Sequence, residues 1–570
     1  MDQTSACQIF TVSLGGAAGD GVREAGNNLS QVLANAGFEV FQSFKYPSLI
    51  RGGHNYARIS FAKEKVWNDH ENIDVLVAMN EETIKTHLHC LRDDGVVFAE
   101  QFDDADRERL KNNAVQLPFT ALAKQFNAPY IARSSVALGA FCYLIDIPLD
   151  EMIAVLSRVF KEKGAEANIA LAKAGHDEME KMGFRHYRRL AVEGAEPKTM
   201  IDGNTALAQG LKAAGLDLYI AYPMTPSTGI LHYLAKMQKD FGIKVLQPEN
   251  EIAGINMAIG AAYAGKRAAV GTATGGFALM QEAMSLAGMS ETPVVVAVSQ
   301  RSAPATGIPT HSSQADLRFA IHSGHGEFPR LVLAPGDPEE AFLCGANALN
   351  LAWKYQVPAI VLLDKHVSEN MMTATIDGSS IKAEKGRVAE NKEGYRRYAI
   401  TDDGISPLAF PGTPGIAVKA TSYEHDEQGI ATEDAVEAEK MQDKRFAKGA
   451  SLENEVGAHE TIKVYGDPAA ENAILFWGSG KTVLLEAAKY FEKPARLIQV
   501  IWMEPFDADR IIGALSGATN IIDFEYNHNG QLAGLLREQT GIVPSQAILR
   551  YDSKPFTPLE LAEVVNEYLK

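Results

Sequence analysis

The sequence predicts a multi-domain α/β protein in which doubly wound parallel sheets form the cores. Two observations support this fold class. The chain has 570 residues, too many for one hydrophobic core, and about 150 residues per domain gives roughly four domains. Short apolar runs also alternate with amphipathic helical patterns along most of the chain, as they do in successive βαβ units.

The N-terminal part begins with a strand at 8–14, a glycine-rich loop at 15–21 and a helix at 22–36, ended by Gly37. Further strands are predicted at 56–61, 75–79 and 96–99, with a helix at 81–91. We interpret this part as a mostly parallel sheet. A polar stretch at 175–196 is predicted to be a linker.

A second α/β unit starts near residue 201. Its predicted elements are strands at 218–221, 268–274, 294–299 and 359–363 and helices at 251–264 and 278–288. From 367 to 470 the chain contains Gly/Pro-rich turns and a charged stretch at 433–448, for which we predict a long exposed helix with solvated charges.

The last hundred residues return to α/β, with strands at 473–477, 496–500 and 520–525 and helices at 482–491 and from 558. The predicted domains are therefore 1–190, 198–370, an arm or linker at 371–470, and 471–570.

Composition limits the classes of partner. The net charge of −18 disfavours nucleic acid or an anionic membrane surface as the main partner. No apolar run approaches the ~18 residues that span a bilayer. The four cysteines form no C-x-x-C pair, so no sequence-local ligand set exists for zinc or an iron–sulfur cluster. Scattered cysteines favour reduced thiols and a cytoplasmic protein.

Two glycine-rich loops resemble nucleotide-binding motifs without matching them. The loop at 478–482 ends like a Walker A motif, but Leu475 stands where that motif has its first glycine. The N-terminal loop leads to Glu24 instead of the third glycine of G-x-G-x-x-G. A plain strand-to-helix turn is the favoured interpretation of 478–482. A non-catalytic nucleotide-binding or regulatory protein that uses either loop remains the alternative.

Three motifs that follow strands in sequence order carry the chemistry. Tyr222-Pro223-Met224-Thr225-Pro226-Ser227 places a hydroxyl in a rigid turn between two prolines. Glu251 opens a helix rich in Gly and Ala, which allows very close packing of another backbone. Arg301 follows a strand and precedes a hydroxyl-rich loop that ends at Thr310, and an arginine there can bind a carboxylate bidentately.

In this order the motifs resemble those of the 2-oxoacid:ferredoxin oxidoreductase family, thiamine diphosphate enzymes that oxidatively decarboxylate 2-oxo acids onto coenzyme A. Residues 222–227 resemble the family's YPITPS motif, with Met224 in place of isoleucine. Residues 301–310 resemble its R-x-GPSTGxPT loop, with Ala303 and Ala305 in place of glycine and serine. The resemblance covers nearly the whole chain and implies an N-terminal gamma domain (with 15–21 and 51–54 as matches), a pyrimidine-binding domain and a small C-terminal domain (with 525–527 and 530–532 as matches).

The resemblance also implies roles for individual residues. Glu251 would hydrogen-bond the aminopyrimidine N1′ of thiamine diphosphate, Arg301 would bind the substrate's C1 carboxylate, and Thr225 would orient the carboxylate or keto oxygen. These three are the expected catalytic residues. The expected substrate-binding residues are Tyr222, Pro223, Thr225, Arg301 and Thr310, and the expected cofactor-binding residues are Glu251, Thr274, Gly275 and Gly276. No metal ligand is expected in this chain.

The missing motifs indicate a partner. The chain lacks a GDG…NN motif at the spacing that the diphosphate and Mg²⁺ require, because the copy at residues 19–28 is too compact. By the resemblance, Mg²⁺ and a [4Fe–4S] cluster belong to a separate beta subunit, coenzyme A is the co-substrate and ferredoxin the electron carrier. We expect an (alpha-beta)2 assembly that is inactive without the beta chain.

The favoured substrate is 2-oxoglutarate, converted to succinyl-CoA or formed in the reverse carboxylation, because the gamma–alpha fusion resembles the 2-oxoglutarate enzymes. A dianion requires a second cation, for which Lys45, Arg51 and His311 are candidates. Pyruvate and branched-chain 2-oxo acids remain alternatives, as does a non-oxidative thiamine enzyme.

Overall fold

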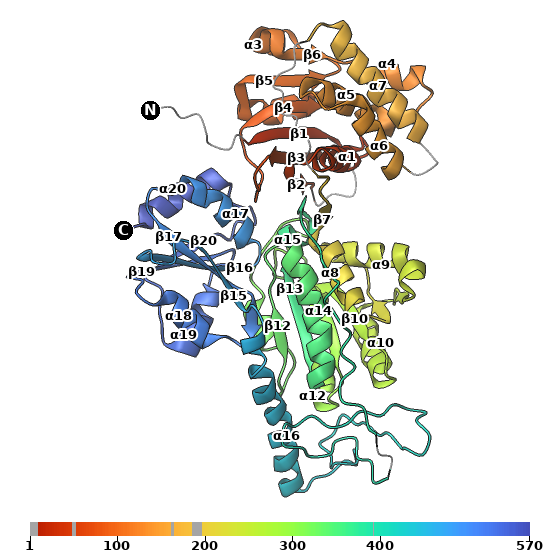
Figure 1. The fold of residues 1–570 in the computed structure, drawn as a ribbon, viewed down its shortest axis with the longest axis vertical. Coiled ribbons are helices and arrows are strands. Elements are labelled where there is room, and N and C mark those ends of the chain that lie inside the picture. The colour runs from red at the N-terminus through yellow and green to blue at the C-terminus, as the bar shows by residue number, and fades with distance from the viewer. Residues whose placement is uncertain (1–8, 48–52, 161–164, 185–195, 391–392) are drawn as a thin grey trace. The chain divides into compact units, whose positions relative to one another are not determined.

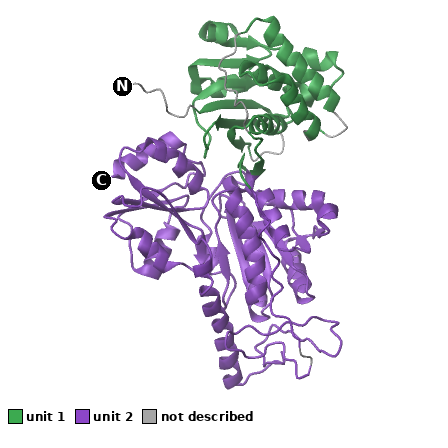
Figure 2. Ribbon diagram, viewed as in Figure 1, with its two compact units in different colours: residues 1–201, 370–375 green, residues 202–369, 376–570 purple. Residues whose placement is uncertain are grey.

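The computed structural model describes residues 9–47, 53–160, 165–184, 196–390 and 393–570. The chain divides into two compact units, residues 1–201 with 370–375, and residues 202–369 with 376–570 (Figures 1 and 2). Both units combine helices with sheets that contain parallel strands, so the predicted multi-domain α/β fold class is confirmed. The finer four-domain division stays a prediction.

The first unit contains an eight-stranded sheet in the order β6-β5-β4-β1-β3-β2-β14-β7. The strands are β1 (Phe10–Ala17), β2 (Glu39–Lys45), β3 (His54–Ala62), β4 (Ile73–Ala78), β5 (Leu91–Ala99), β6 (Ala114–Gln116), β7 (Met200–Asp202) and β14 (Met371–Thr373). β1, β4, β5 and β6 are parallel, whereas β3 is antiparallel to both β1 and β2. The prediction of a mostly parallel sheet is therefore wrong here. The segment from β2 to β3 is too short for the helical crossover that parallel neighbours need.

The helices of the first unit are α1 (Val22–Asn35), α2 (Glu81–His87), α3 (Asp104–Leu110), α4 (Phe119–Gln125), α5 (Ser134–Leu144), α6 (Leu149–Val159) and α7 (Ala165–Lys181). The predicted linker at 175–196 is wrong at its start, since α7 continues to Lys181. A Cβ on Gly175 would lie 2.0 Å from the backbone oxygen of Val136, and one on Gly139 would lie 1.7 Å from that of Ala172. Gly175 is thus a close-packing residue between α5 and α7.

The second unit is centred on a seven-stranded sheet in the order β18-β12-β13-β11-β10-β8-β9. Its strands are β8 (Leu218–Ile220), β9 (Lys244–Leu246), β10 (Ala268–Ala273), β11 (Val294–Gln300), β12 (Leu331–Leu333), β13 (Pro358–Asp364) and β18 (Trp502–Glu504). The strands are parallel apart from β18, which is antiparallel to β12. β11 is buried along its whole length, as expected of a strand covered on both faces.

Helices flank this sheet on both sides (Figure 1). They are α8 (Gly203–Ala213), α9 (Thr228–Phe241), α10 (Glu251–Tyr263), α11 (Thr274–Leu279), α12 (Gln281–Met289), α13 (Leu317–Ile321), α14 (Pro338–Tyr355) and α15 (Lys365–Glu369). The single helix predicted at 278–288 is two, α11 and α12. Because the strands are parallel, the loops after β8, β10 and β11 emerge at one edge of the sheet, where open α/β sheets bind ligands.

The C-terminal part of this unit has a five-stranded sheet in the order β15-β17-β16-β19-β20. Its elements are β15 (Ile462–Gly466), β16 (Asn472–Trp477), β17 (Ala495–Val500), β19 (Asn520–Glu525), β20 (Gln546–Leu549), α17 (Gly480–Ala487), α18 (Ala508–Leu515), α19 (Gln531–Thr540) and α20 (Pro558–Tyr568). β18 leaves this part of the chain to extend the seven-stranded sheet, so the two sheets share one unit.

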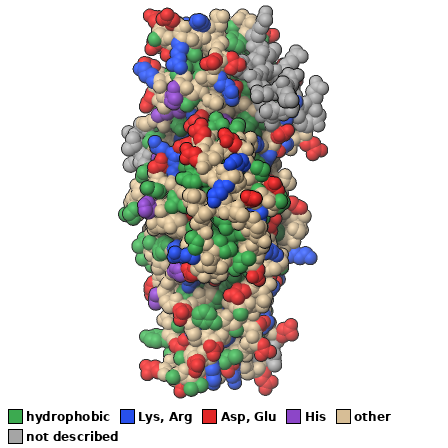
Figure 3. Space-filling view, turned by 90° about the vertical axis from the view of Figure 1, so that its left-hand side faces the viewer, with side chains coloured by type: hydrophobic (Ala, Val, Ile, Leu, Met, Phe, Trp, Pro, Cys, Tyr) green, Lys and Arg blue, Asp and Glu red, His purple; other side chains and the backbone are tan. Residues whose placement is uncertain are grey.

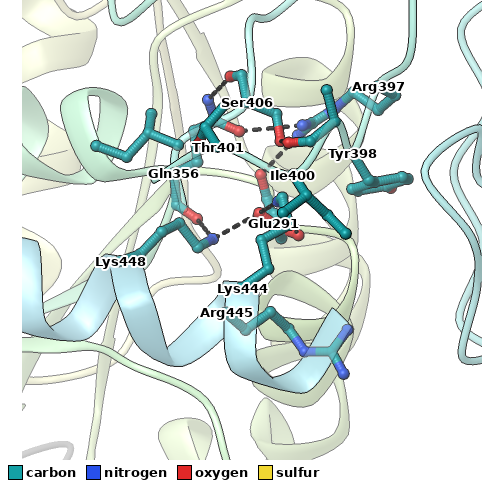
Figure 4. A network of polar contacts seen from close by, with 12 residues as sticks. Glu291, Gln356, Arg397, Tyr398, Ile400, Thr401, Ser406, Lys444, Arg445 and Lys448 are labelled. Atoms are coloured by element: carbon teal, nitrogen blue, oxygen red, sulfur yellow. Dashed lines mark hydrogen bonds and ion pairs between the residues drawn. The ribbon is translucent and has the colours of Figure 1, made fainter. Parts of the chain in front are cut away.

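Helix α16 (Ala435–Glu453) forms where the charged stretch predicted one, but the prediction of solvated charges is wrong for two of its lysines. Lys444 and Lys448 are buried against Glu291 (Figure 4). Lys444 Nζ donates to both carboxylate oxygens of Glu291 at 2.8 and 2.7 Å, and Lys448 Nζ lies 2.8 Å from one of them. Burial alone would raise the pKa of Glu291, but the surrounding cations outweigh it and hold the pKa well below its ordinary value.

The surface drawn in Figure 3 mixes acidic, basic and apolar side chains, without one sign of charge covering the face. Within the described residues, no helix is long and apolar enough to cross a membrane.

Candidate active site

Three of the predicted site residues meet at the carboxyl edge of the seven-stranded sheet. Arg301 follows the last residue of β11 and is 9% exposed. Its Nη1 donates a hydrogen bond of 2.8 Å to the backbone oxygen of Thr225, in the turn after β8. Burial lowers the pKa of Arg301, and the charge of Glu251 opposes that shift. The Arg301 guanidinium therefore hydrogen-bonds the turn that contains Thr225 and interacts electrostatically with the Glu251 carboxylate.

Glu251 is the first residue of α10 and is 4% exposed. The helix starts there because the Asn250 side chain accepts the backbone N–H of Ala253 at 2.9 Å, a standard N-cap. Among the described residues, no group hydrogen-bonds Glu251 Oε1, although that atom is buried. A buried carboxyl oxygen without a partner is costly, so Glu251 Oε1 is available to hydrogen-bond a group bound at this edge of the sheet.

Gly276 keeps space open for the Glu251 carboxyl. A Cβ at Gly276 would lie 2.1 Å from Thr272 Oγ1 and 2.8 Å from Glu251 Oε1. Of its predicted neighbours, Gly275 is open, with only the backbone oxygen of Ala305 at 3.9 Å. The start of α11 thus lies directly against Glu251. Any side chain at Gly276 would displace the Glu251 carboxyl group.

Thr274 is placed beside this glycine pair, but its hydroxyl is already engaged. Thr274 Oγ1 donates to Asp316 Oδ2 at 2.6 Å, and the backbone N–H of Asp316 donates to Gln300 Oε1 at 3.0 Å. Burial raises the pKa of Asp316 to about 6, and the Thr274 hydroxyl opposes the shift. The Thr274 hydroxyl therefore fixes the start of α11 to Asp316, which fits a positioning role for Thr274.

The segment after Arg301 folds back on itself. The backbone N–H of Ser302 donates to the oxygen of His311 at 3.0 Å, and that of Ile308 donates to the oxygen of Ser302 at 3.2 Å. This returns Thr310 towards Arg301, with Thr310 Oγ1 lying 3.3 Å from His311 Nδ1. A Cβ on Gly307 would lie 1.8 Å from the Ser302 oxygen, so the fold of the segment requires glycine there.

Tyr222 is 39% exposed and Pro223 is half-buried, so the first half of the Tyr222–Ser227 motif is accessible. The second half is anchored. Asn204 Nδ2 donates to the Pro226 oxygen at 2.9 Å, and Ser227 Oγ donates to the Met224 oxygen at 2.8 Å. Asn204 was not predicted from the sequence, because a single asparagine near a helix start has no distinguishing pattern.

The C-terminal sheet supports the same edge. Asn527 Nδ2 donates to the Gln314 oxygen at 3.1 Å, and Gln531 Nε2 donates to the Ala315 oxygen at 2.7 Å. Gln314 in turn donates to the Trp477 oxygen at 2.9 Å. The motifs at 525–527 and 530–532 therefore hold the chain just beyond Thr310 in position. Gln314 itself carried no signal in the sequence.

The two glycine-rich loops differ in what they hold. Lys481 is buried and forms ion pairs with Asp337 and Glu340, the latter at 2.5 Å. The charge of Lys481 is therefore neutralised by residues of the same unit, which supports the interpretation of 478–482 as a plain strand-to-helix turn. In the N-terminal loop, Arg133 Nη2 donates to Asp20 Oδ1 at 2.9 Å and closes the loop from inside.

The structure does not bring together the residues predicted to bind a second carboxylate of the substrate. Lys45 belongs to the first unit and His311 to the second, and Arg51 lies outside the described residues. Their role stays a prediction. A cavity of about 880 Å³ lies between α10, α12 and α16, but none of the predicted site residues lines it. Within the described residues, no cluster of three His, Cys, Asp or Glu side chains could hold a metal ion.

Comparisons with known proteins match both the N-terminal part and the site-bearing part of the chain. A family model described as pyruvate flavodoxin/ferredoxin oxidoreductase, thiamine diphosphate-binding, matches residues 209–444. A second, described as pyruvate ferredoxin/flavodoxin oxidoreductase, matches residues 11–178. The first of these ranges contains Thr225, Glu251 and Arg301.

Similar proteins cover nearly the whole chain. The alpha subunit of the 2-oxoacid:ferredoxin oxidoreductase of Saccharolobus solfataricus is 32% identical, over 96% of this chain and 96% of its own. The 2-oxoglutarate oxidoreductase subunit KorA of Mycobacterium tuberculosis is 28% identical, over 98% and 91%. The 2-oxoglutarate:ferredoxin oxidoreductase of Magnetococcus marinus, solved with 2-oxoglutarate, coenzyme A and succinyl-CoA bound, superposes with a TM-score of 0.88 and 29% identity, over 99% of this chain and 100% of its own.

The order of motifs, the three-residue site and the full-length match agree. The chain belongs to the 2-oxoacid:ferredoxin oxidoreductase family, with a pyruvate ferredoxin/flavodoxin oxidoreductase domain at 11–178 followed by a thiamine diphosphate-binding domain at 209–444.

Proposed function

We propose that the chain is the alpha subunit of a 2-oxoglutarate:ferredoxin oxidoreductase. The complex would convert 2-oxoglutarate, coenzyme A and two oxidised ferredoxins to succinyl-CoA, carbon dioxide, one proton and two reduced ferredoxins, or run the reverse carboxylation. The observation that carries the proposal is the buried, unpartnered Oε1 of Glu251 in the field of Arg301. The choice of 2-oxoglutarate rests on the names of the Magnetococcus and Mycobacterium relatives. Pyruvate and branched-chain acids are the other candidates.

The residues present fit thiamine diphosphate. When bound, that cofactor supplies a carbon nucleophile and an electron sink. Glu251 would hold a proton against the aminopyrimidine nitrogen N1′, which supplies the partner that Oε1 lacks. Gly276 would keep this approach open, with Gly275 beside it. The Thr274–Asp316 hydrogen bond would hold the loop that carries both glycines.

Substrate binding would use the other half of the site. Arg301 would bind the C1 carboxylate of the 2-oxo acid through guanidinium N–H groups not spent on Thr225. Thr225 would orient the carboxylate or keto oxygen, with Tyr222 and Pro223 beside it. Thr310 would position the distal end of the substrate.

The proposal also includes the partners of this chain. A beta subunit would carry Mg²⁺ and the [4Fe–4S] cluster, ferredoxin would accept the electrons, and two alpha-beta pairs would assemble. Exposed apolar side chains around Glu251 support such a partner, since Ile252 and Met257 of α10 and Leu279 of α11 are about half exposed. The cytoplasmic location stays a prediction.

The test is reconstitution. The chain alone and the chain co-expressed with a candidate beta subunit are assayed for viologen-dye reduction that requires both a 2-oxo acid and coenzyme A. We expect no activity from the chain alone, and a higher kcat/KM with 2-oxoglutarate than with pyruvate from the complex. Full activity without a second polypeptide would refute the subunit assignment, and a preference for pyruvate would refute the substrate.

A further inference from the structure

The start of α11 has no cap of its own. Thr274 is the first residue of this helix, and the preceding Ala273 has no side chain that can cap it. The helix is only six residues long, so few hydrogen bonds within it hold its first turn. Gly275 and Gly276 follow at once, and glycine loses more conformational freedom on folding than any other residue. The position of the two glycines therefore depends on a contact from another part of the chain.

That contact is made by Asp316, which lies 42 residues further along the chain. Thr274 Oγ1 donates a hydrogen bond of 2.6 Å to Asp316 Oδ2, and both side chains are buried. The pKa of Asp316, raised by burial to about 6, still leaves this carboxyl group mostly ionised above about pH 7. A buried hydrogen bond to an ionised carboxylate is stronger than one between neutral groups. The Asp316 carboxylate therefore replaces the missing cap.

Asp316 also holds the strand end that precedes Arg301. Its backbone N–H donates to Gln300 Oε1 at 3.0 Å, and Gln300 Nε2 donates to the backbone oxygen of Leu363 at 3.2 Å. Gln300 is fully buried at the end of β11 and directly precedes Arg301. One residue thus contacts both halves of the site. The side chain of Asp316 fixes the start of α11 beside Glu251, and its backbone fixes the end of β11.

We propose that Asp316 is a positioning residue of this site, and that its carboxylate, through the Thr274 hydroxyl, holds Gly276 against Glu251. The tolerance there is small, because a Cβ on Gly276 would already lie 2.8 Å from Glu251 Oε1, and a displacement of about 1 Å is enough to impair a catalytic site. The role rests on the proposed function, which makes Glu251 the residue that contacts thiamine diphosphate.

A set of variants separates positioning from stability. Asp316→Ala removes the acceptor of the Thr274 hydroxyl. Thr274→Val removes the hydroxyl at nearly constant shape and tests the same hydrogen bond if Asp316→Ala does not assemble, whereas Thr274→Ser keeps the hydroxyl. The matched control is Asp507→Ala, because Asp507 is a buried acid of the same unit that accepts the hydroxyl of the buried Thr461. Both alanine variants should lower the melting temperature.

The first measurement is hydrogen–deuterium exchange by mass spectrometry on the assembled complex in the absence of substrate. We expect the amides of α11 to exchange at least about tenfold faster in Asp316→Ala and Thr274→Val than in the wild type. Thr274→Ser and Asp507→Ala should exchange there at the wild-type rate. This measurement tests the contact whether or not the complex is active.

The second measurement is titration of the complex with thiamine diphosphate, followed by steady-state kinetics at saturating cofactor. The Kd of the cofactor should rise about tenfold in Asp316→Ala and Thr274→Val and stay at the wild-type value in Thr274→Ser and Asp507→Ala. The KM for the 2-oxo acid should change little in Asp316→Ala, because the backbone hydrogen bond to Gln300 is kept.

Two results would overturn the proposal. One is wild-type exchange in α11 and wild-type cofactor Kd in both Asp316→Ala and Thr274→Val. The other is faster exchange in α11 with an unchanged cofactor Kd, which would show a structural role only. Absence of 2-oxo-acid-dependent dye reduction in the wild type would instead refute the proposed function, while exchange and cofactor binding would still decide the role of Asp316.

Discussion

Replacing Arg301 tests the substrate half of the site. In Arg301→Ala the guanidinium that donates to the Thr225 oxygen at 2.8 Å is removed, and so is the positive charge that faces Glu251. The variant cannot bind a carboxylate through paired N–H groups. Arg301→Lys keeps the charge but loses the planar fork.

The expected magnitude follows from these contacts. Truncating one partner of a buried charge pair costs about 2–5 kcal/mol, and 1.4 kcal/mol corresponds to a factor of ten. For Arg301→Ala we therefore expect kcat/KM for the 2-oxo acid to fall by roughly 10²- to 10³-fold. Arg301→Lys should lose about tenfold, since one charge-assisted hydrogen bond of the pair is lost. The KM for coenzyme A should change little in either variant.

The assay is dye reduction by the assembled complex at varied 2-oxo acid and saturating coenzyme A. Arg318→Ala is the matched control, because Arg318 belongs to the same unit and its side chain forms a partly exposed ion pair with Glu538. An Arg301→Ala complex that assembles, binds thiamine diphosphate and keeps wild-type kcat/KM would show that this arginine does not bind substrate.

Three further predictions concern the second unit. Glu291→Gln leaves Lys444 and Lys448 buried without their carboxylate, so it should lower the free energy of unfolding by about 3–5 kcal/mol. The control variant Lys440→Ala removes only the exposed ion pair with Glu437 and should have no measurable effect. An equal loss of stability in both variants would count against the buried cluster. Burial raises the pKa of Glu504 to about 7 from its ordinary value of 4.5. The folded protein therefore binds an extra proton between these pH values and loses about 3 kcal/mol of stability as the pH rises through that window. Glu504→Gln should therefore raise the melting temperature more at pH 8 than at pH 5, and an equal shift at both would refute this assignment. Gly276→Ala inserts a methyl group 2.8 Å from Glu251 Oε1 and should weaken thiamine diphosphate binding at least tenfold. Gly513→Ala, where nothing lies within 4 Å of the added methyl group, should leave the affinity unchanged. Unchanged cofactor affinity in Gly276→Ala would contradict the proposed contact between Glu251 and the cofactor.

The sequence predicted well what depends on local pattern. Strand β11 and helix α10 begin and end within about two residues of their predicted positions, because a continuous apolar run and an Asn250 cap are local signals. The sequence placed Thr225, Glu251 and Arg301 near one another because each follows a strand of one parallel sheet, which brings their loops to one edge. Their roles stay a prediction.

Features that depend on distant partners were missed. The buried lysines of α16 look like solvated charges, since Glu291 lies 153 residues away from Lys444. The antiparallel position of β3 and the pairing of β14 with β2 also depend on tertiary contacts. Asp316 and Gln314 take part in the site through single hydrogen bonds, and single polar residues carry no periodic signal.

The central claim is that Glu251 acts on the cofactor, and one measurement tests it most directly. Glu251→Gln preserves the size of the side chain but cannot hold or transfer the proton. In the assembled complex with thiamine diphosphate bound, the rate of deuterium exchange at the cofactor's C2 position is measured by rapid quench and NMR. We predict exchange at least 100-fold slower in Glu251→Gln than in the wild type, the scale of general acid–base catalysis, with cofactor still bound. Exchange at the wild-type rate in the cofactor-loaded variant would contradict the account.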